Sequence, residues 1–126
     1  MFSSFAYPEL SSVLVESLRL DQAALDDGAY WKFASYALLH FSWIHIALNL
    51  IGLFFFGPIF ESWHGRKNFL VVLIGGILVG GLLHSLLDSE TAAVGASGGI
   101  LAILACLAAH SILSRDGSRW YTVPRA

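Results

Sequence analysis

Three long apolar stretches constrain the fold of this chain more than any other feature of its sequence. They run over about 34–60, 69–87 and 94–113, and a helix needs about 20 residues to cross a bilayer. In lipid, only helices and closed barrels satisfy all their backbone hydrogen bonds internally. The sequence therefore predicts an all-α membrane protein, a polytopic helical bundle to which this chain contributes three transmembrane helices.

The composition indicates the same class. Apolar residues make up 56% of the chain and charged residues 13%, whereas soluble domains average about 45–50% and about 25%. These charges are too few to cover a small soluble domain, so we expect a lipid bilayer around much of the surface. The net charge of −2 comes with no basic stripe, so no nucleic-acid partner is predicted. Cys106 is the single cysteine, which excludes an internal disulfide and a cysteine-based metal site.

Three segments are expected along the chain. Residues 1–30 form an N-terminal extracytoplasmic segment, in which Pro8 to Leu20 has the spacing of a short amphipathic helix. Residues 31–113 form the membrane domain, and residues 114–126 form a polar cytoplasmic tail.

The basic residues orient the three spans. Arg66 and Lys67 follow the first span and three arginines follow the third, whereas the link between the second and third spans has neither Lys nor Arg. By the positive-inside rule, the first link and the tail are cytoplasmic. The N-terminal segment and the link at 88–93 are then predicted to lie outside.

Small residues line the second and third spans. Gly76 and Gly80 have the small-xxx-small spacing that lets another helix approach closely. Small residues also recur every three or four positions along the third span, which is typical of a central helix. We expect both faces to pack against helices, and an uncovered face at Gly76 and Gly80 would favour dimerisation or aggregation.

Two polar clusters interrupt the apolar pattern: His40, His45 and Asn49 in the first span, and Ser97 at the start of the third. Ionisable residues inside a span are costly and usually face a functional site. His45 and Asn49 are four residues apart and share one helix face, while His40 is placed on a different part of the surface. Since both spans enter from the outside, His45, Asn49 and Ser97 are predicted at a similar depth near the external face.

Ser97 has the surroundings expected of a serine nucleophile. A helix start supplies free N–H groups and a positive dipole end, which stabilise an oxyanion. Gly95 and Gly98 flank the serine region and allow a substrate to approach the backbone. His45 and Asn49 can donate further hydrogen bonds to the same oxyanion.

Other interpretations of these residues stay open. The stretch Gly95-Ala96-Ser97-Gly98 also suits helix packing, and with Gly99 it fits the Gly-x-Ser-x-Gly elbow of α/β-hydrolases, which needs a preceding strand that residues 88–93 do not predict. A His–Asn pair can also clamp two helices together for about 0.6 kcal/mol. The five-residue spacing of His40 and His45 disfavours metal or haem, so no metal and no cofactor is predicted.

The order and spacing of these motifs resemble the rhomboid family of intramembrane serine proteases. The resemblance covers about residues 18–113, and the residues that carry it are Trp31-Lys32, the run from His40 to Asn49, Gly57, Glu61, Gly65 and Gly95-Ala96-Ser97-Gly98. It implies a six-helix bundle whose active site opens to water on the outer side, which for this chain is expected to be the outer side of a bacterial plasma membrane.

By position, the resemblance assigns a role to each polar residue. It implies that Ser97 is the nucleophile and that its backbone N–H, together with His45 and Asn49, stabilises the oxyanion. His40 corresponds to a histidine that supports the site structurally, as Gly95 and Gly98 are also expected to do. The implied substrates are single-span membrane proteins, cut near the outer end of their helix.

Three features depart from the family pattern. The family's general base is a histidine on the sixth helix, in an Ala-His-x-x-Gly-like setting that this sequence lacks. His110 lies about 20 Å beyond Ser97 along the same helix, and nothing in the sequence positions His84 as a base. The family's first helix is missing or reduced to residues 1–20. Lys32 stands where an arginine usually follows the tryptophan, and lysine lacks the planar fork of arginine.

We therefore expect a rhomboid serine endopeptidase, present as a fragment without the first and the last two helices. We expect this fragment to be inactive alone, because a serine without a base is a weak nucleophile. The alternative is a rhomboid-like pseudoprotease that binds transmembrane clients without cleaving them. A structural helix bundle with an accidental resemblance is a third interpretation.

Overall fold

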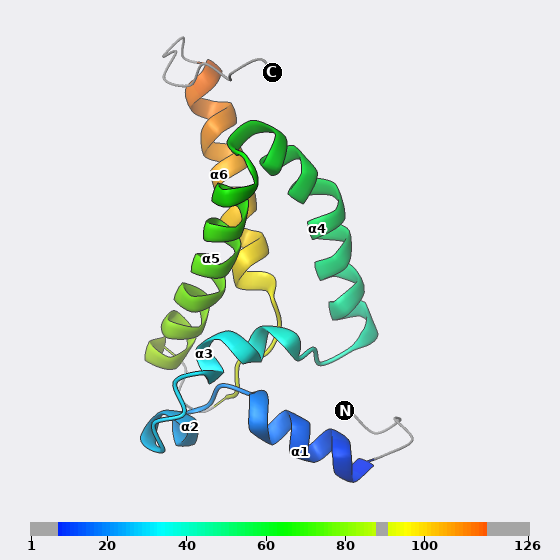
Figure 1. Cartoon of the computed structure of the whole chain (residues 1–126), viewed down its shortest axis with the longest axis vertical. Helices are drawn as coiled ribbons and strands as arrows, with labels where there is room; N and C mark the ends of the chain where they lie inside the picture. The colour runs from blue at the N-terminus through cyan, green and yellow to red at the C-terminus, as the bar shows by residue number, and fades with distance from the viewer. Residues whose placement is uncertain (1–7, 88–90, 116–126) are drawn as a thin grey trace.

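The protein is built from helices, as a computed structural model of the chain shows (Figure 1). The structure describes residues 8–87 and 91–115, and within them the only β-type pairing is an isolated antiparallel bridge between Leu20 and Ala93. The helices in chain order are α1 (Pro8–Leu18), α2 (Gln22–Asp26), α3 (Lys32–Ser35), the 3-10 helix η1 (Tyr36–Leu38), α4 (Trp43–His64), α5 (Arg66–Leu87) and α6 (Ser97–Arg115). The all-α fold class is thereby confirmed. Most of the tail expected at 114–126 lies outside the described residues.

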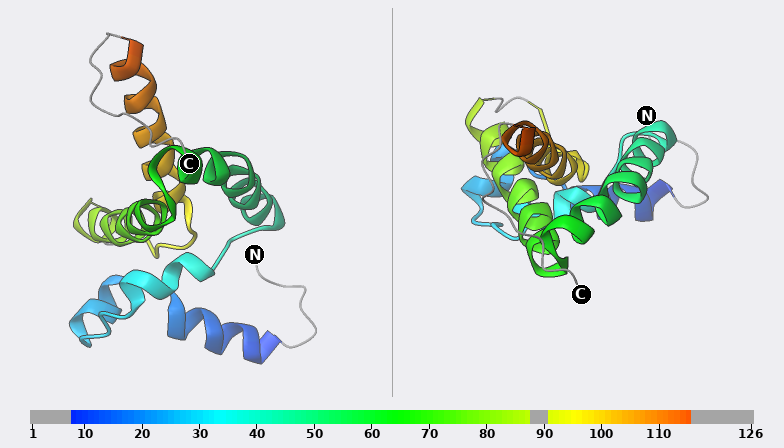
Figure 2. Two further views of the ribbon diagram at one scale, coloured as in Figure 1. Left: turned by 45° about the horizontal axis from the view of Figure 1, so that its top comes forward. Right: turned by 90° about the horizontal axis from the view of Figure 1, so that it is seen from above.

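Three of these helices are long and apolar enough to cross a membrane: α4, α5 and α6 over Ser97–Ser114. This agrees with the expected number of spans, and the protein is an integral membrane protein. Figure 2 shows α5 and α6 side by side with α4 to one side of them. The short helices α1 to α3 lie across the end of the bundle where α6 begins (Figure 1).

The first span begins later than the sequence pattern suggested, at Trp43 rather than near residue 34. Ser42 is its N-cap, with extended backbone and a side-chain oxygen that accepts a hydrogen bond from the N–H of His45 at 3.2 Å. The apolar residues before it belong to α3 and η1, where Tyr36 and Ala37 are buried by protein. Their apolar character therefore reflects contact with the protein core, which composition alone does not distinguish from contact with lipid.

The connection between α4 and α5 is very short. Gly65 caps α4 at φ +82°, and its N–H donates to the carbonyl of Glu61 at 2.8 Å. The conformation at Gly65 is one that side-chain-bearing residues rarely adopt. Arg66 already begins α5, so the turn reverses the chain within one residue and fixes α4 and α5 as an antiparallel pair.

The glycines of α5 pack against the start of α6, as their spacing predicts. A Cβ placed on Gly76 would lie 2.6 Å from Cβ of Ala102 and 2.8 Å from the carbonyl oxygen of Gly98. Gly80 also faces α6, though less closely, since its Cβ would lie 3.4 Å from Cα of Gly98. The glycine face at Gly76 and Gly80 is therefore covered by α6 within the chain.

A small core ties the N-terminal helices to the loop that precedes α6. It contains the buried residues Leu20, Tyr36 and Ala93. The N–H of Ala93 donates to the carbonyl of Leu20 at 2.8 Å, and the N–H of Gly95 donates to the carbonyl of Tyr36 at 3.0 Å. The Tyr36 hydroxyl donates to the carbonyl of Ile77 on α5 at 2.6 Å. These bonds set the path of the chain into Ser97.

Lys32 also joins two of these segments. Its ammonium donates to the carbonyl of Glu16 in α1 at 2.9 Å. Next to it, the Ser35 hydroxyl donates to the carbonyl of Leu18 at 3.1 Å. The lysine thus bonds a carbonyl in the last turn of α1 and links α3 to that helix.

Candidate active site

Ser97 is the first residue of α6. At a helix start the first N–H groups have no partner within the helix, so those of Ser97 and Gly98 are available to an incoming acceptor. The same end carries the positive pole of the helix dipole. Ser97 therefore stands where negative charge on a bound group is stabilised.

Gly95 joins this helix start to the polar face of α4. It has φ +102°, and a Cβ placed on it would lie 2.6 Å from Cε1 and 2.8 Å from Nε2 of His45. The same Cβ would lie 3.7 Å from Nδ2 of Asn49. The structure thus brings His45 and Asn49 against the backbone two residues before Ser97. A side chain at this position would therefore collide with the His45 ring.

Gly98 has a packing role as well. A Cβ on Gly98 would lie 2.8 Å from the carbonyl oxygen of Gly76 and 3.5 Å from Cα of Gly80. Any larger residue would push α5 and α6 apart. Gly98 therefore supports the position of Ser97 from the side of α5, as Gly95 does from the side of α4.

His40 lies with the other two polar residues of its cluster, and its expected separation from them is wrong. Its Nε2 is 2.7 Å from Nδ2 of Asn49, and its ring centroid is 5.0 Å from that of His45. The expectation assumed a continuous helix from residue 34, whereas His40 lies in the loop before α4 and folds back onto it. His40 is therefore placed to fix the orientation of the Asn49 side chain.

The contact with Asn49 also defines the state of the His40 ring. An amide nitrogen can only donate, so Nε2 of His40 is the acceptor and the neutral ring carries its proton on Nδ1. Burial lowers the pKa of His40 and the charge of His45 lowers it further, against a smaller opposite effect of a hydrogen bond with the backbone of Leu38. The neutral ring is therefore favoured, which keeps the acceptor available to Asn49.

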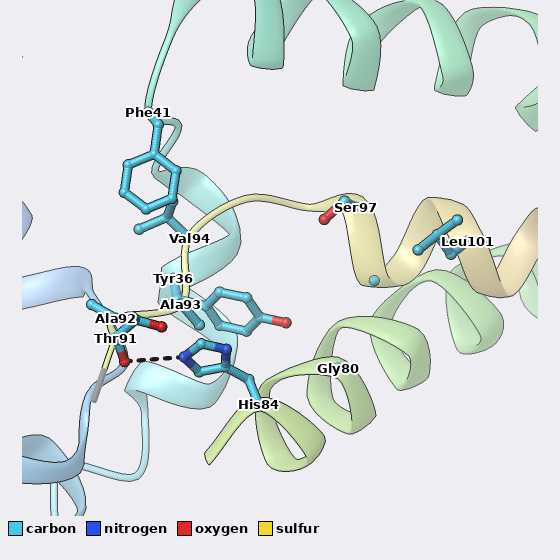
Figure 3. Close-up of a pocket in the computed structure, with 11 residues that line it drawn as sticks. Tyr36, Phe41, Gly80, His84, Thr91, Ala92, Ala93, Val94, Ser97 and Leu101 are labelled. Carbon is cyan, nitrogen blue, oxygen red and sulfur yellow. Dashed lines mark hydrogen bonds between the residues drawn. The ribbon is translucent and has the colours of Figure 1, made fainter. Parts of the chain in front are cut away.

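A pocket of about 550 Å³ opens beside Ser97 (Figure 3). Tyr36, His84 and Thr91 line it together with the serine. Figure 3 shows the Ser97 hydroxyl directed into this space, with the Tyr36 and His84 rings along its wall. The sequence did not identify Tyr36 as part of the site. For His84 the sequence did contain an indication, because an ionisable residue within an apolar span usually faces a functional site.

His110 lies far from this pocket, near the opposite end of α6. Its ring centroid is 4.8 Å from that of Trp63 and 5.0 Å from that of His64, both in the last turn of α4. It cannot contact Ser97, as the sequence spacing predicted. Among the described residues, no three His, Cys, Asp or Glu side chains gather as a metal site requires.

An integral membrane protein with a serine at a helix start and a polar His–Asn face beside it belongs to a restricted class. The sequence matches the Rhomboid domain over residues 27–123, and the chain belongs to the rhomboid family.

Curated relatives agree with this assignment. The chain is 27% identical over 89 residues to human "Rhomboid-related protein 3", covering 71% of this chain and 22% of that protein. It is 36% identical over 74 residues to mouse "Rhomboid-related protein 2", covering 59% of this chain and 24% of that protein. It is 30% identical over 78 residues to "Putative rhomboid protease YdcA" of Bacillus subtilis (strain 168), covering 61% of this chain and 39% of that protein. The chain thus spans well under half the length of these relatives, and no solved structure matches it.

Proposed function

We propose that this chain carries the nucleophile half of an intramembrane serine endopeptidase, with Ser97 as the nucleophile. One observation carries the proposal: His45 and Asn49 lie against Gly95, at the helix start that bears Ser97. A serine, the free N–H groups of the helix start and two side-chain donors are then close to one another at the start of α6.

Each group has a defined task in peptide-bond attack. Oγ of Ser97 adds to the carbonyl carbon of the substrate, and the carbonyl oxygen becomes an oxyanion. The backbone N–H of Ser97 donates to this oxyanion, and His45 and the second amide hydrogen of Asn49 donate from the other side. His40 holds the first amide hydrogen, which fixes the Asn49 side chain. One such donor contributes about 2.7–4 kcal/mol to transition-state stabilisation.

The orientation follows from the charges next to the spans. Arg66 and Lys67 lie at the turn between α4 and α5, at the opposite end of these helices from Ser97. With this turn on the cytoplasmic side, Ser97 faces the outside of a bacterial plasma membrane. The substrates are then single-span membrane proteins whose helix unwinds near its outer end.

None of the five histidines has the setting of the family's general base, and we expect the 126 residues alone not to turn over a transmembrane substrate. Peptide cleavage needs a base to take the serine proton and then an acid to protonate the leaving amine. The test is a fluorogenic transmembrane substrate added to the chain in lipid vesicles. Turnover that Ser97→Ala abolishes would contradict the expected inactivity.

The same assay on the full-length gene product tests the protease itself. We expect cleavage that Ser97→Ala abolishes and Ser111→Ala, a matched change on the exposed face of α6, leaves intact. The second candidate is a pseudoprotease that binds transmembrane clients. It predicts no cleavage, together with photocrosslinking to a single-span client that is equal in the wild type and in Ser97→Ala.

A further inference from the structure

Tyr36 joins several parts of the structure that surround Ser97. It belongs to η1, is 4% exposed and packs with Leu20 and Ala93 in one small core. Its side chain also lines the pocket beside Ser97 (Figure 3). A buried tyrosine usually bonds a partner through its hydroxyl, so its hydrogen bonds define which segments it holds together.

The side chain of Tyr36 is fixed to α5. Its hydroxyl donates to the carbonyl of Ile77 at 2.6 Å. Two glycines of α5 leave room for the phenol, since a Cβ on Gly81 would lie 3.0 Å from Cε1 of Tyr36. A Cβ on Gly80 would lie 3.3 Å from the hydroxyl oxygen. Ordinary contacts are about 3.5–4.0 Å, so the phenol fits closely against one turn of α5.

The backbone of Tyr36 is fixed to the loop before Ser97. Its carbonyl accepts a hydrogen bond from the N–H of Gly95 at 3.0 Å. Gly95 is also the residue against which His45 and Asn49 lie, and it comes two residues before Ser97. Tyr36 thus connects a turn of α5 to the point of the loop where the two candidate oxyanion donors meet the backbone.

We propose that Tyr36 is a positioning residue for Ser97. The start of α6 packs against α5, and Tyr36 holds the loop at Gly95 to the same helix. The two attachments together set the Oγ and N–H of Ser97 relative to the side chains of His45 and Asn49. The Tyr36 hydroxyl is bonded to α5, so this residue acts through the loop and not on the reacting atoms. The inference rests on the proposed function, because it takes Ser97 as the nucleophile.

A phosphonofluoridate probe measures this alignment. Oγ of Ser97 forms a bond to phosphorus, the P–F bond breaks, fluoride leaves and the serine proton passes to water. The phosphoryl oxygen gains negative charge in the transition state, so the rate depends on where the oxyanion donors lie. Fluoride leaves without being protonated, whereas peptide cleavage also needs an acid at the leaving amine. Reaction with the probe is therefore compatible with the absence of peptide turnover expected for the chain alone.

The experiment measures Ser97 labelling in the 126-residue chain in lipid vesicles at increasing probe concentration, by mass spectrometry of the intact protein. Tyr36→Phe removes the hydroxyl and keeps the ring. A displacement of about 1 Å can slow a reaction by about 100-fold, so we expect this variant to lower the maximal labelling rate at least about tenfold. The probe concentration at half the maximal rate should stay unchanged, because the ring that lines the pocket is kept.

Two control variants separate positioning from stability. Ile103→Val shortens a side chain in the separate core that Ile103 forms with Phe60 and Leu107, which destabilises the chain away from the loop before Ser97. Tyr30→Phe removes a hydroxyl from a tyrosine that is 69% exposed. Both should label like the wild type. Unfolding in SDS measures the stability of each variant, so that rates are compared between folded proteins.

Each other outcome overturns a stated part. If Ile103→Val slows labelling as much as Tyr36→Phe, Tyr36 only stabilises the fold and the inference is wrong. If Tyr36→Phe changes only the half-saturating probe concentration, the residue contributes to binding and not to positioning. If Tyr36→Phe matches the wild type while Ser97→Ala is unlabelled, the inference fails and Ser97 remains the nucleophile. If the wild type reacts no faster than Ser97→Ala, Ser97 is not a nucleophile in this chain, and the inference and the proposed site fall together.

Discussion

The contact between α5 and α6 at Gly76 allows the packing of the site to be tested by adding one methyl group. A Cβ at Gly76 would lie 2.6 Å from Cβ of Ala102, 2.8 Å from the carbonyl oxygen of Gly98 and 2.9 Å from Cα of Gly99. Ordinary contacts are about 3.5–4.0 Å, so the methyl requires the helices to separate by roughly 1 Å. Two of the three atoms belong to the backbone and cannot rotate away.

Overpacking of this kind costs about 1–3 kcal/mol. We therefore expect Gly76→Ala to be less stable than Gly75→Ala by about 2 kcal/mol, which is roughly 30-fold in the unfolding equilibrium. Gly75 is the matched control, because its Cβ would meet no atom within 4 Å. Both substitutions change the helix propensity of α5 in the same way, so the difference reports the α5–α6 contact.

The assay is unfolding of the purified chain in mixed micelles by increasing SDS, followed by far-UV circular dichroism or tryptophan fluorescence. The two variants are compared in the same detergent at the same protein concentration. Equal unfolding free energies for Gly76→Ala and Gly75→Ala would refute the close packing of α5 on α6.

Three further predictions concern the surroundings of Ser97. Gly95→Ala should slow phosphonofluoridate labelling at least tenfold, because φ of +102° disfavours alanine and its Cβ would displace His45; labelling at the wild-type rate would contradict this. Tyr36→Phe should lower the free energy of unfolding by about 1 kcal/mol, since it removes the bond to the carbonyl of Ile77, and an unchanged SDS midpoint would contradict it. The pKa of His40 lies below its usual value of 6.5, mainly through burial, so its contribution to stability is complete above about pH 6.5 and is lost as the pH falls through the folded pKa. Unfolding measured from pH 7.5 to 5 should show this loss, and His40→Gln should reduce it.

The sequence was sufficient for the fold class and for the close approach of α5 and α6. Long apolar stretches and small-xxx-small spacing depend on local composition, which lipid and helix packing select directly. The start of α4 was harder to predict from the sequence, because residues buried in protein and residues facing lipid are equally apolar. Ser42 could have indicated where α4 begins, because a serine before a helix commonly caps it by accepting a hydrogen bond from an N–H of the first turn.

The candidate site was predictable to a similar degree. His45 and Asn49 could be paired from their spacing on one helix, and Ser97 from its place at a helix start. The contact of His40 with Asn49 depends on how a loop folds back, which periodicity does not encode. The bond of His84 to Thr91 likewise depends on the path of the loop before α6. Tertiary contacts of this kind needed the structure.

The measurement that tests the site most directly is the rate at which a phosphonofluoridate labels Ser97 when the two side-chain donors are removed one at a time. The account predicts that His45→Ala and Asn49→Ala each slow labelling by about 100-fold or more, as expected for the loss of one oxyanion donor. Peptide mapping should place the adduct of the wild type on Ser97. Labelling of both variants at the wild-type rate, or an adduct on another serine, would contradict the claim that Ser97, His45 and Asn49 form one catalytic site.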